Sequence, residues 1–167
     1  EAPYLRTPVA LDDLGRHVTW IDGGALGRIA LVPGVETRDA AHVPDVMRGE
    51  ETQVLGALTA SGRRSGLFVL PGTHSKWVTV EDLRITGFRT FMTGEVFAAL
   101  RGHTILGRLM GEGGDTHDAT GFQAGVVAGA APGGPGALLN RIFASRTHGL
   151  CDGWPAERLR SYLSGLL

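Results

Sequence analysis

The sequence predicts an α/β fold in which a strand and a hairpin are followed by several helices. Two patterns carry this prediction. An apolar run over 66–70 and alternation of apolar and polar residues over 76–80 and 83–91 are typical of strands, and apolar residues recur at helical spacing over 50–60 and from residue 94 onward. Glycine contributes 26 of the 167 residues, about twice its average share of roughly 7%. These glycines fall mostly between the periodic segments, where turns are expected.

The first part of the chain is predicted to contain a short helix, with Asp12 or Asp13 as its candidate cap. A buried strand is predicted over 28–33, where a Pro-Gly pair ends it, and the polar residues 36–48 are expected to form a loop. Residues 50–60 are predicted to be a helix, because apolar side chains recur one turn apart and acids occupy the first turn, where they suit the helix dipole.

The rest of the chain is predicted to hold three strands and then helices. Strands are expected over 66–70, 76–80 and 83–91, the last two joined as a hairpin by the turn at Glu81-Asp82. The helices are expected over 94–101, 118–130, 137–147 and 155–167.

Composition narrows the class of protein. A formal charge of −1 and a mean hydropathy of +0.04 argue against a nucleic-acid binder and against disorder. No apolar run approaches the roughly 20 residues that cross a bilayer, so no membrane partner is expected. Cys151 is the single cysteine and cannot form an internal disulfide, which suits the reducing cytoplasm. Because the chain starts at Glu1 and stops inside a predicted amphipathic helix, we expect a fragment.

The segment LPGTHSKW is the first candidate for chemistry, since it joins two predicted strands through a turn rich in small polar residues. Gly72 would let a ligand approach the backbone, and the N–H groups of the turn, with the hydroxyls of Thr73 and Ser75, could cradle phosphate oxygens. His74 would add a donor, and Lys76, the only lysine of the sequence, a point charge. The alternative is an ordinary polar hairpin turn with an exposed lysine. The Walker A spacing is absent.

The segment DVMRGEETQ is the second candidate. It places Asp45, Arg48, Glu50, Glu51 and Gln53 at a predicted loop-to-helix junction. Phosphoryl transfer to a hydroxyl requires a carboxylate that accepts the proton and cations that hold spreading negative charge. A solvated helix N-terminus with its usual acids is the alternative reading. No metal site is predicted, because the pair His117-Asp118 lacks a second ligand pair at a useful spacing.

Residues 53–80 resemble the second phosphate-binding region of the actin and sugar-kinase superfamily. A glutamine-led helix, an ASGR-type turn, a strand, a glycine turn and a second strand follow one another in both, and Gln53, 60–63 and 66–70 hold the matching places. The turn that begins at Pro71 departs from the Asp-led glycine turn of actin. The segments EAPYLRTPV, DVMRGEETQVLGAL, LPGTHSKWV, FRTFMTGE and YLSGLL resemble, more closely, the 2-dehydro-3-deoxygalactonokinase family.

This resemblance implies ATP-dependent phosphorylation of the terminal hydroxyl of 2-dehydro-3-deoxy-D-galactonate, with Mg²⁺, giving the 6-phosphate and ADP in cytoplasmic galactonate breakdown. It also implies an actin-like fold of two ribonuclease-H-like domains with the nucleotide between them. Residues 1–60 would end the first, substrate-side domain, and 61–167 would begin the second, nucleotide-side domain. The expected partners are a sugar acid and a nucleotide, with a homodimer possible. A first phosphate loop before Glu1 and an adenosine segment after Leu167 would be missing.

The resemblance also implies roles for the residues of the second candidate segment. Glu50 is the expected base, with Glu51 as the alternative, because Gly-Glu-Glu resembles the G-D-Q-type turn of sugar kinases. Arg48 is expected to contact a substrate carboxylate or phosphate. Asp45 is expected to orient Arg48 or to bind a sugar hydroxyl. Gln53 occupies the position of the water-orienting glutamine of actin.

The residues from Gly72 to Lys76 are expected to hold the ATP phosphates. Regular pleating would place Lys76 on the same side as Val78, so its long stem is expected to carry the ammonium to the nucleotide. Three alternatives stay open: a non-catalytic actin-like nucleotide-binding domain, a phosphatase of the same fold that positions water with Gln53 or Glu50, and a kinase for a related sugar acid.

Overall fold

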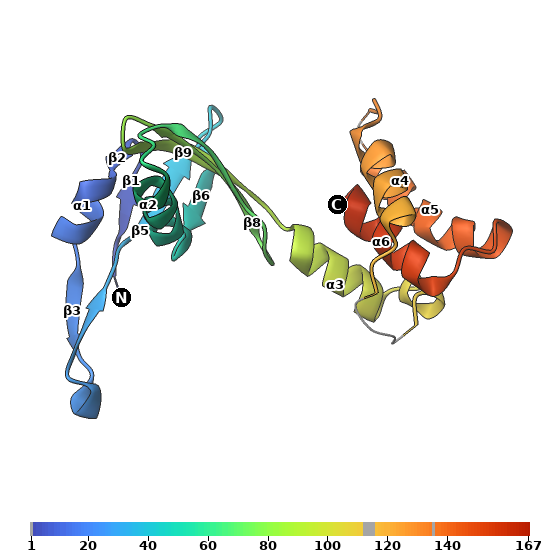
Figure 1. Cartoon of the computed structure of the whole chain (residues 1–167), viewed down its shortest axis with the longest axis horizontal. Coiled ribbons are helices and arrows are strands. Elements are labelled where there is room, and N and C mark those ends of the chain that lie inside the picture. Colours follow the sequence, from blue (N-terminus) through green and yellow to red (C-terminus); the bar gives the residue numbers. More distant parts are fainter. Residues whose placement is uncertain (1, 112–115, 135) are drawn as a thin grey trace. The chain divides into compact units, whose positions relative to one another are not determined.

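The computed structural model describes residues 2–111, 116–134 and 136–167, which form a mixed α/β structure of two compact units, Glu1–Met92 and Thr93–Leu167 (Figure 1). Strands predominate in the first unit and helices in the second, and the predicted elements occur in the predicted order with further strands among them. The domain boundary expected at residues 60 and 61 falls inside the first unit. How the two units divide between the domains of a complete kinase stays a prediction.

The elements of the first unit have the following bounds. The strands are β1 (Tyr4–Arg6), β2 (Val9–Ala10), β3 (Thr19–Asp22), β4 (Arg28–Leu31), β5 (Gly34–Arg38), β6 (Pro44–Met47), β7 (Gly66–Leu70), β8 (Ser75–Glu81) and β9 (Arg84–Phe91). The helices are α1 (Leu11–Arg16), α2 (Glu50–Ser61) and the short 3-10 helix η1 (Gly24–Leu26). The expected short first helix is therefore confirmed as α1, but Asp12 and Asp13 lie in its first turn and do not cap it, because the cap position is Ala10.

The largest sheet of this unit has four antiparallel strands in the order β2-β9-β8-β7. The predicted hairpin is confirmed as β8 and β9. Along β8, Val78 and Val80 are buried whereas Trp77 and Thr79 are exposed, as alternation along a strand requires. The core beneath joins these strands to α2 through Val54 and Leu58. The sheet therefore rests on the helix that carries the second candidate segment.

The expectation of a loop over 36–48 is wrong. Strand β5 pairs in parallel with β1 and antiparallel with β6, giving a second sheet of order β1-β5-β6. The polar residues of this stretch do not show the alternation typical of strands. Val35 and Thr37 are nevertheless buried on one face of β5. Pairing with a strand on each side satisfies the backbone hydrogen-bonding groups of β5. A short polar sequence does not by itself predict such pairing.

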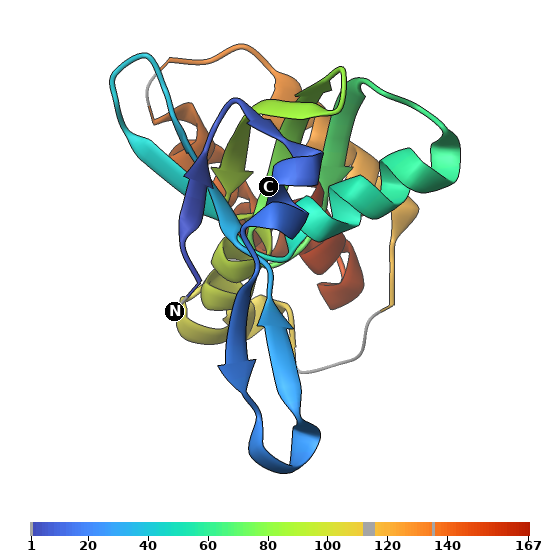
Figure 2. The same cartoon turned by 90° about the vertical axis from the view of Figure 1, so that its left-hand side faces the viewer.

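The predicted strand over 28–33 exists as β4, but it is not a buried strand. It pairs with β3 alone, in a two-stranded antiparallel ribbon that projects from the first unit (Figure 2). Trp20 and Ile21 on β3 and Leu26 at the tip are exposed, and the guanidinium of Arg28 lies 4.7 Å from the ring centre of Trp20.

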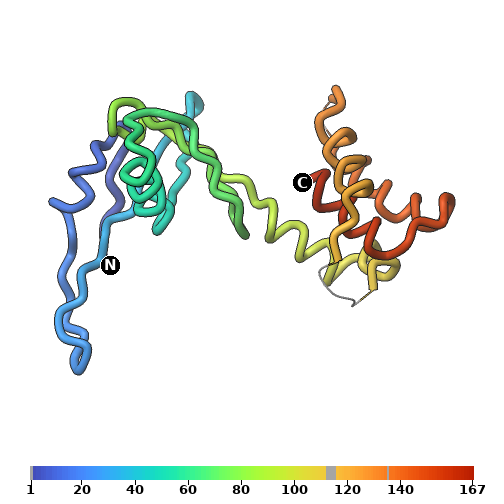
Figure 3. The backbone as a smooth tube through the Cα atoms, in the orientation of Figure 1, coloured from blue at the N-terminus to red at the C-terminus, as the bar shows by residue number. Residues whose placement is uncertain are grey.

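The second unit contains the four predicted helices, as the backbone trace shows (Figure 3). They are α3 (Thr93–His103), α4 (Ala119–Ala130), α5 (Ala137–Cys151) and α6 (Ala156–Leu166), with the 3-10 helix η2 (Gly107–Leu109) after α3. Asp118 caps α4 by accepting a 2.6 Å hydrogen bond from the N–H of Gly121. Helices α4 and α6 approach closely: a Cβ added at Gly125 would lie 2.1 Å from the carbonyl oxygen of Tyr162. None of the described helices is both long and apolar enough to span a bilayer.

Candidate active site

The junction between β6 and α2 holds the two candidate carboxylates. Gly49 precedes the helix with φ +107°, a conformation that favours glycine, and Glu50 is the first helical residue, as predicted. The Oε2 of Glu50 accepts a 3.0 Å hydrogen bond from the N–H of Arg48. The Oε2 of Glu51 accepts one of 2.7 Å from the N–H of Gly49. Both side chains therefore fold back onto the loop and fix its backbone.

The two carboxylates differ in burial. Glu51 is 1% exposed, and burial raises its pKa above the usual value, against the opposing effect of hydrogen bonds from its own N–H and that of Gly49. Glu50 is half-buried, so a ligand in solvent can reach its carboxylate directly. The geometry therefore favours Glu50 as the group that meets a substrate and Glu51 as the group that holds the loop.

Arg48 is anchored at the other side of this junction. Its Nη2 donates a 2.8 Å hydrogen bond to the carbonyl of Ala2, and its guanidinium lies 4.4 Å from the ring centre of Tyr4. The cation over the aromatic face and the hydrogen bond together hold the side chain against the start of the chain. Gln53 is exposed on α2, one turn after Glu50, and lies on the same helical face.

Asp45 and Lys76 belong to the two candidate segments, and Thr90 on β9 brings them together. The carboxylate of Asp45 accepts hydrogen bonds from the backbone N–H of Thr90 at 2.7 Å and from its hydroxyl at 2.6 Å. The ammonium of Lys76 donates to the same hydroxyl at 2.8 Å and to the carbonyl of Val46 at 3.0 Å. Lys76 is 5% exposed and shares the inner side of β8 with Val78. In the structure its ammonium is therefore bound inside the first unit.

The turn between β7 and β8 is open on its outer side. Gly72, Thr73 and His74 are exposed, whereas Ser75 is buried. The N–H of Gly72 donates a 3.3 Å hydrogen bond to the Oγ of Ser75, which closes the turn. A Cβ added at Gly72 would meet nothing within 4 Å, so the backbone there is accessible to a ligand.

Thr90 is the site residue that the sequence reasoning missed. Thr90 is the partner of Lys76 in the β8–β9 register. The predicted hairpin could have identified it, because a lysine on the inner side of a strand needs a polar partner on the neighbouring strand. The contacts that β6 makes through Asp45 and Val46 could not have been predicted, since residues 44–47 were expected to lie in a loop.

The side chains of the candidate site could bind a metal ion only together with a bound substrate or nucleotide. Among residues 2–111, 116–134 and 136–167, no three His, Cys, Asp or Glu side chains gather where they could hold a metal. Mg²⁺ commonly keeps several waters and binds through one or two carboxylates together with substrate phosphates. Mg²⁺ held mainly by the phosphates of ATP and by water therefore needs no cluster of three protein ligands, and the described residues are compatible with it.

The comparison with known proteins assigns the chain to a family. The model of the 2-keto-3-deoxy-galactonokinase family matches residues 1–167, so the chain belongs to this family. The resemblance drawn from the sequence is therefore confirmed.

Three relatives illustrate the match. The "Probable 2-dehydro-3-deoxygalactonokinase" of Rhizobium meliloti (strain 1021) is 42% identical over 100% of this chain and 54% of its own length. The 2-dehydro-3-deoxygalactonokinase of Escherichia coli (strain K12) is 36% identical over 99% of this chain and 53% of its own length. A Sinorhizobium meliloti protein whose crystal structure bears the same kinase name is 41% identical, with a TM-score of 0.86 over 99% of this chain and 54% of that one. The chain thus spans about half the length of these relatives.

Proposed function

We propose that the full-length protein transfers the γ-phosphoryl group of ATP to the terminal hydroxyl of 2-dehydro-3-deoxy-D-galactonate, giving the 6-phosphate and ADP. Family membership and the names of the relatives support the reaction. The single structural observation that supports it best is the pair of carboxylates at the start of α2, one reachable and one buried. The resemblance to actin-like kinases supports a fold of two ribonuclease-H-like domains, and the cytoplasm, where ATP is available, is the proposed location.

In this proposal Glu50 is the general base. The substrate hydroxyl oxygen forms a bond to the γ-phosphorus while its proton passes to the carboxylate of Glu50, and the bond between the γ-phosphorus and the bridging oxygen of ADP breaks. Bound Mg²⁺ would neutralise phosphate charge as ADP leaves. Glu51 keeps the N–H of Gly49 engaged and so holds the loop in which Glu50 stands.

The remaining residues are proposed to bind and orient. Asp45 orients the loop, because both of its carboxylate oxygens accept hydrogen bonds from Thr90. Arg48, stacked on Tyr4, presents a cation for the substrate carboxylate or a phosphate, and Gln53 would contact the substrate from the exposed face of α2.

The turn from Gly72 to Ser75 is proposed to hold the ATP phosphates. Its accessible backbone and the hydroxyl of Thr73 support this role, with His74 as a further donor. Lys76, on the buried side of β8 directly after this turn, would attract the phosphates through its positive charge. A homodimer is proposed from the family resemblance alone.

The test is a kinase assay of the full-length protein with purified substrates. ADP release is followed by a coupled assay, and ³¹P NMR identifies the ester. We expect ADP and the 6-phosphate in equal amounts from 2-dehydro-3-deoxygalactonate. A higher kcat/KM with 2-dehydro-3-deoxygluconate would reassign the substrate, and ATP binding without turnover of either acid would leave a non-catalytic nucleotide-binding domain. Phosphate release from a phosphate ester without ATP would indicate a phosphatase.

A further inference from the structure

We propose that the second unit carries a binding site for a small oxyanion, a phosphate or a carboxylate group, in a pocket built around the guanidinium of Arg160. All residues of this site belong to the second unit, whereas the carboxylates and the turn discussed above belong to the first unit. It is therefore a proposal about binding that does not depend on the assignment of the base.

Arg160 on α6 is a buried cation that has no counter-charge among the described residues. Its residue is 8% exposed, and its Nη1 donates a hydrogen bond to the carbonyl of Met110. A guanidinium stays charged at any ordinary pH, and a buried charge is costly unless it is paired. Over the part of the chain that the structure describes, no carboxylate forms an ion pair with Arg160. An anion from outside would supply the missing charge.

The free nitrogen atoms of Arg160 are accessible from a pocket. No fully buried side-chain nitrogen or oxygen of the described residues lacks a hydrogen-bond partner, so the guanidinium nitrogens other than Nη1 reach open space. Arg160 lines a pocket of about 170 Å³. The other lining residues are Phe97, Arg101, Thr116, His117, Ser161 and Ser164.

The lining of this pocket has the chemistry of an anion site. Its described residues include two arginines, a histidine and three hydroxyls, and none of these described residues is acidic. The Oγ of Ser161 accepts a 2.9 Å hydrogen bond from the N–H of Asp118, so its own proton is available to a ligand. The carboxylate of Asp118 already accepts from the N–H of Gly121 and, at 3.4 Å, from Arg158. It is thus engaged elsewhere and does not neutralise Arg160.

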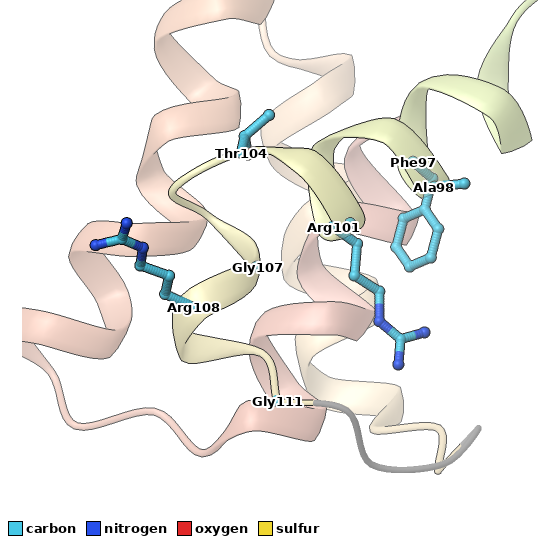
Figure 4. A pocket seen from close by; sticks show the side chains of 8 residues that line it. Phe97, Ala98, Arg101, Thr104, Gly107, Arg108 and Gly111 are labelled. Atoms are coloured by element: carbon cyan, nitrogen blue, oxygen red, sulfur yellow. The ribbon is translucent and has the colours of Figure 1, made fainter.

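A neighbouring cavity makes the contrast clear. It has a volume of about 810 Å³ and also includes Phe97 and Arg101 in its lining. Figure 4 shows that Arg101 and Arg108 point away from each other there, so their charges do not converge on one point. The Arg160 pocket, by contrast, has its buried guanidinium and the hydroxyls of Ser161 and Ser164 on a single helix.

The size of the pocket limits the ligand. A volume of 170 Å³ corresponds to about six water molecules at roughly 30 Å³ each. It lies below the range of about 300–1,000 Å³ that is common for whole drug-sized ligands. A single phosphate or carboxylate group with a few waters therefore fits, either as a free ion or as one end of a larger molecule.

The test is the binding of inorganic phosphate to the full-length protein, measured by isothermal titration calorimetry at constant ionic strength. We expect Arg160→Met to weaken one class of phosphate site by about ten- to a hundredfold, the usual effect of losing a hydrogen bond to a charged group, and Ser164→Ala to weaken it severalfold. Arg108→Met, an exposed arginine outside this pocket, is the matched control and should bind as the wild type does. Circular dichroism checks that each variant is folded.

Competition then distinguishes the source of the anion. Displacement of phosphate from this site by ATP indicates a nucleotide phosphate, displacement by the sugar acid indicates its carboxylate, and displacement by neither indicates free phosphate. Equal affinity in wild type and Arg160→Met would overturn the proposal, as would an equal loss in Arg108→Met. If Arg160→Met does not fold, Ser164→Ala and Arg160→Lys decide, and unchanged phosphate binding in both overturns it. Because no turnover is measured, this result is independent of the proposed kinase reaction.

Discussion

The ammonium of Lys76 donates a 2.8 Å hydrogen bond to the hydroxyl of Thr90, and the two residues are direct partners in the β8–β9 register. The same hydroxyl lies 2.6 Å from the carboxylate of Asp45. Thr90 therefore donates its proton to the carboxylate and accepts one from the ammonium. Since Lys76 also binds the carbonyl of Val46, the strand β6 is tied to the large sheet shortly before the helix begins at Glu50.

The role of the base is tested by Glu50→Gln in the full-length protein. We expect kcat to fall by roughly 10²–10⁴, because the amide cannot accept the proton of the substrate hydroxyl, while ATP binding persists. Steady-state kinetics and calorimetry measure the two quantities. Glu51→Gln is the comparison: a collapse of kcat there with near-normal turnover in Glu50→Gln would move the base by one residue, and activity in both variants would remove it from this pair.

Thr90→Val tests the connection between β6 and β8. The valine keeps the shape of the side chain but leaves Lys76 and Asp45 each without one partner, so we expect the free energy of unfolding to fall by about 1–3 kcal/mol. Urea denaturation measures it. Thr86→Val is the matched control on the same strand, since the Thr86 hydroxyl makes a single 3.4 Å contact. An equal decrease in the free energy of unfolding of the two variants would mean that the Thr90 hydroxyl stabilises the protein no more than the Thr86 hydroxyl does.

Lys76→Met is expected to affect both stability and nucleotide binding. The loss of two buried hydrogen bonds should lower the free energy of unfolding by about 1–3 kcal/mol, a larger effect than an exposed lysine would have. If the ammonium also acts on ATP phosphates, the Kd for ATP should rise about tenfold or more. The double variant with Thr90→Val should be less destabilised than the two single effects together, because they share one interaction. Unchanged ATP affinity would leave Lys76 a purely structural role.

The pH dependence of stability is predicted from Glu51. Its pKa is raised by burial above the usual 4.5, so the folded protein binds the proton more tightly than the unfolded chain. The cost of burying the charged form is present above the folded pKa and is relieved as the pH falls through it. Stability from this group should therefore decrease as pH rises from about 4.5 upward through the folded pKa. In Glu51→Gln this contribution should vanish, and urea titrations of both proteins across that range would show a constant difference if the prediction is wrong.

Gly107→Ala tests the close approach of η2 and α3. A Cβ at Gly107 would lie 1.8 Å from the carbonyl oxygen of Arg101, whereas a Cβ at Gly102 would meet nothing within 4 Å. We therefore expect Gly107→Ala to destabilise the protein by about 1–3 kcal/mol or more. Gly102→Ala, within α3, should be neutral or stabilising by up to about 1 kcal/mol. Thermal unfolding measures both, and equal midpoints would contradict the packing seen at Gly107.

The sequence by itself determined the elements whose signals are local. Strands β7 to β9 and the helices α2 to α6 were predicted because alternation and helical spacing repeat within a few residues of one another. The same holds for the candidate segments around Glu50 and Gly72, whose residue types and spacing carried the family resemblance.

Only the tertiary structure decided how distant segments pair. Strands β5 and β6 are short and polar, so their existence depends on pairing that no local pattern shows. The position of Lys76 inside the first unit depends on Thr90 and on Val46 of β6, and the pocket at Arg160 depends on residues from three stretches of the second unit. Hydrogen bonds and burial of charge join residues far apart in the chain, and the free energy of those contacts is set by the folded arrangement.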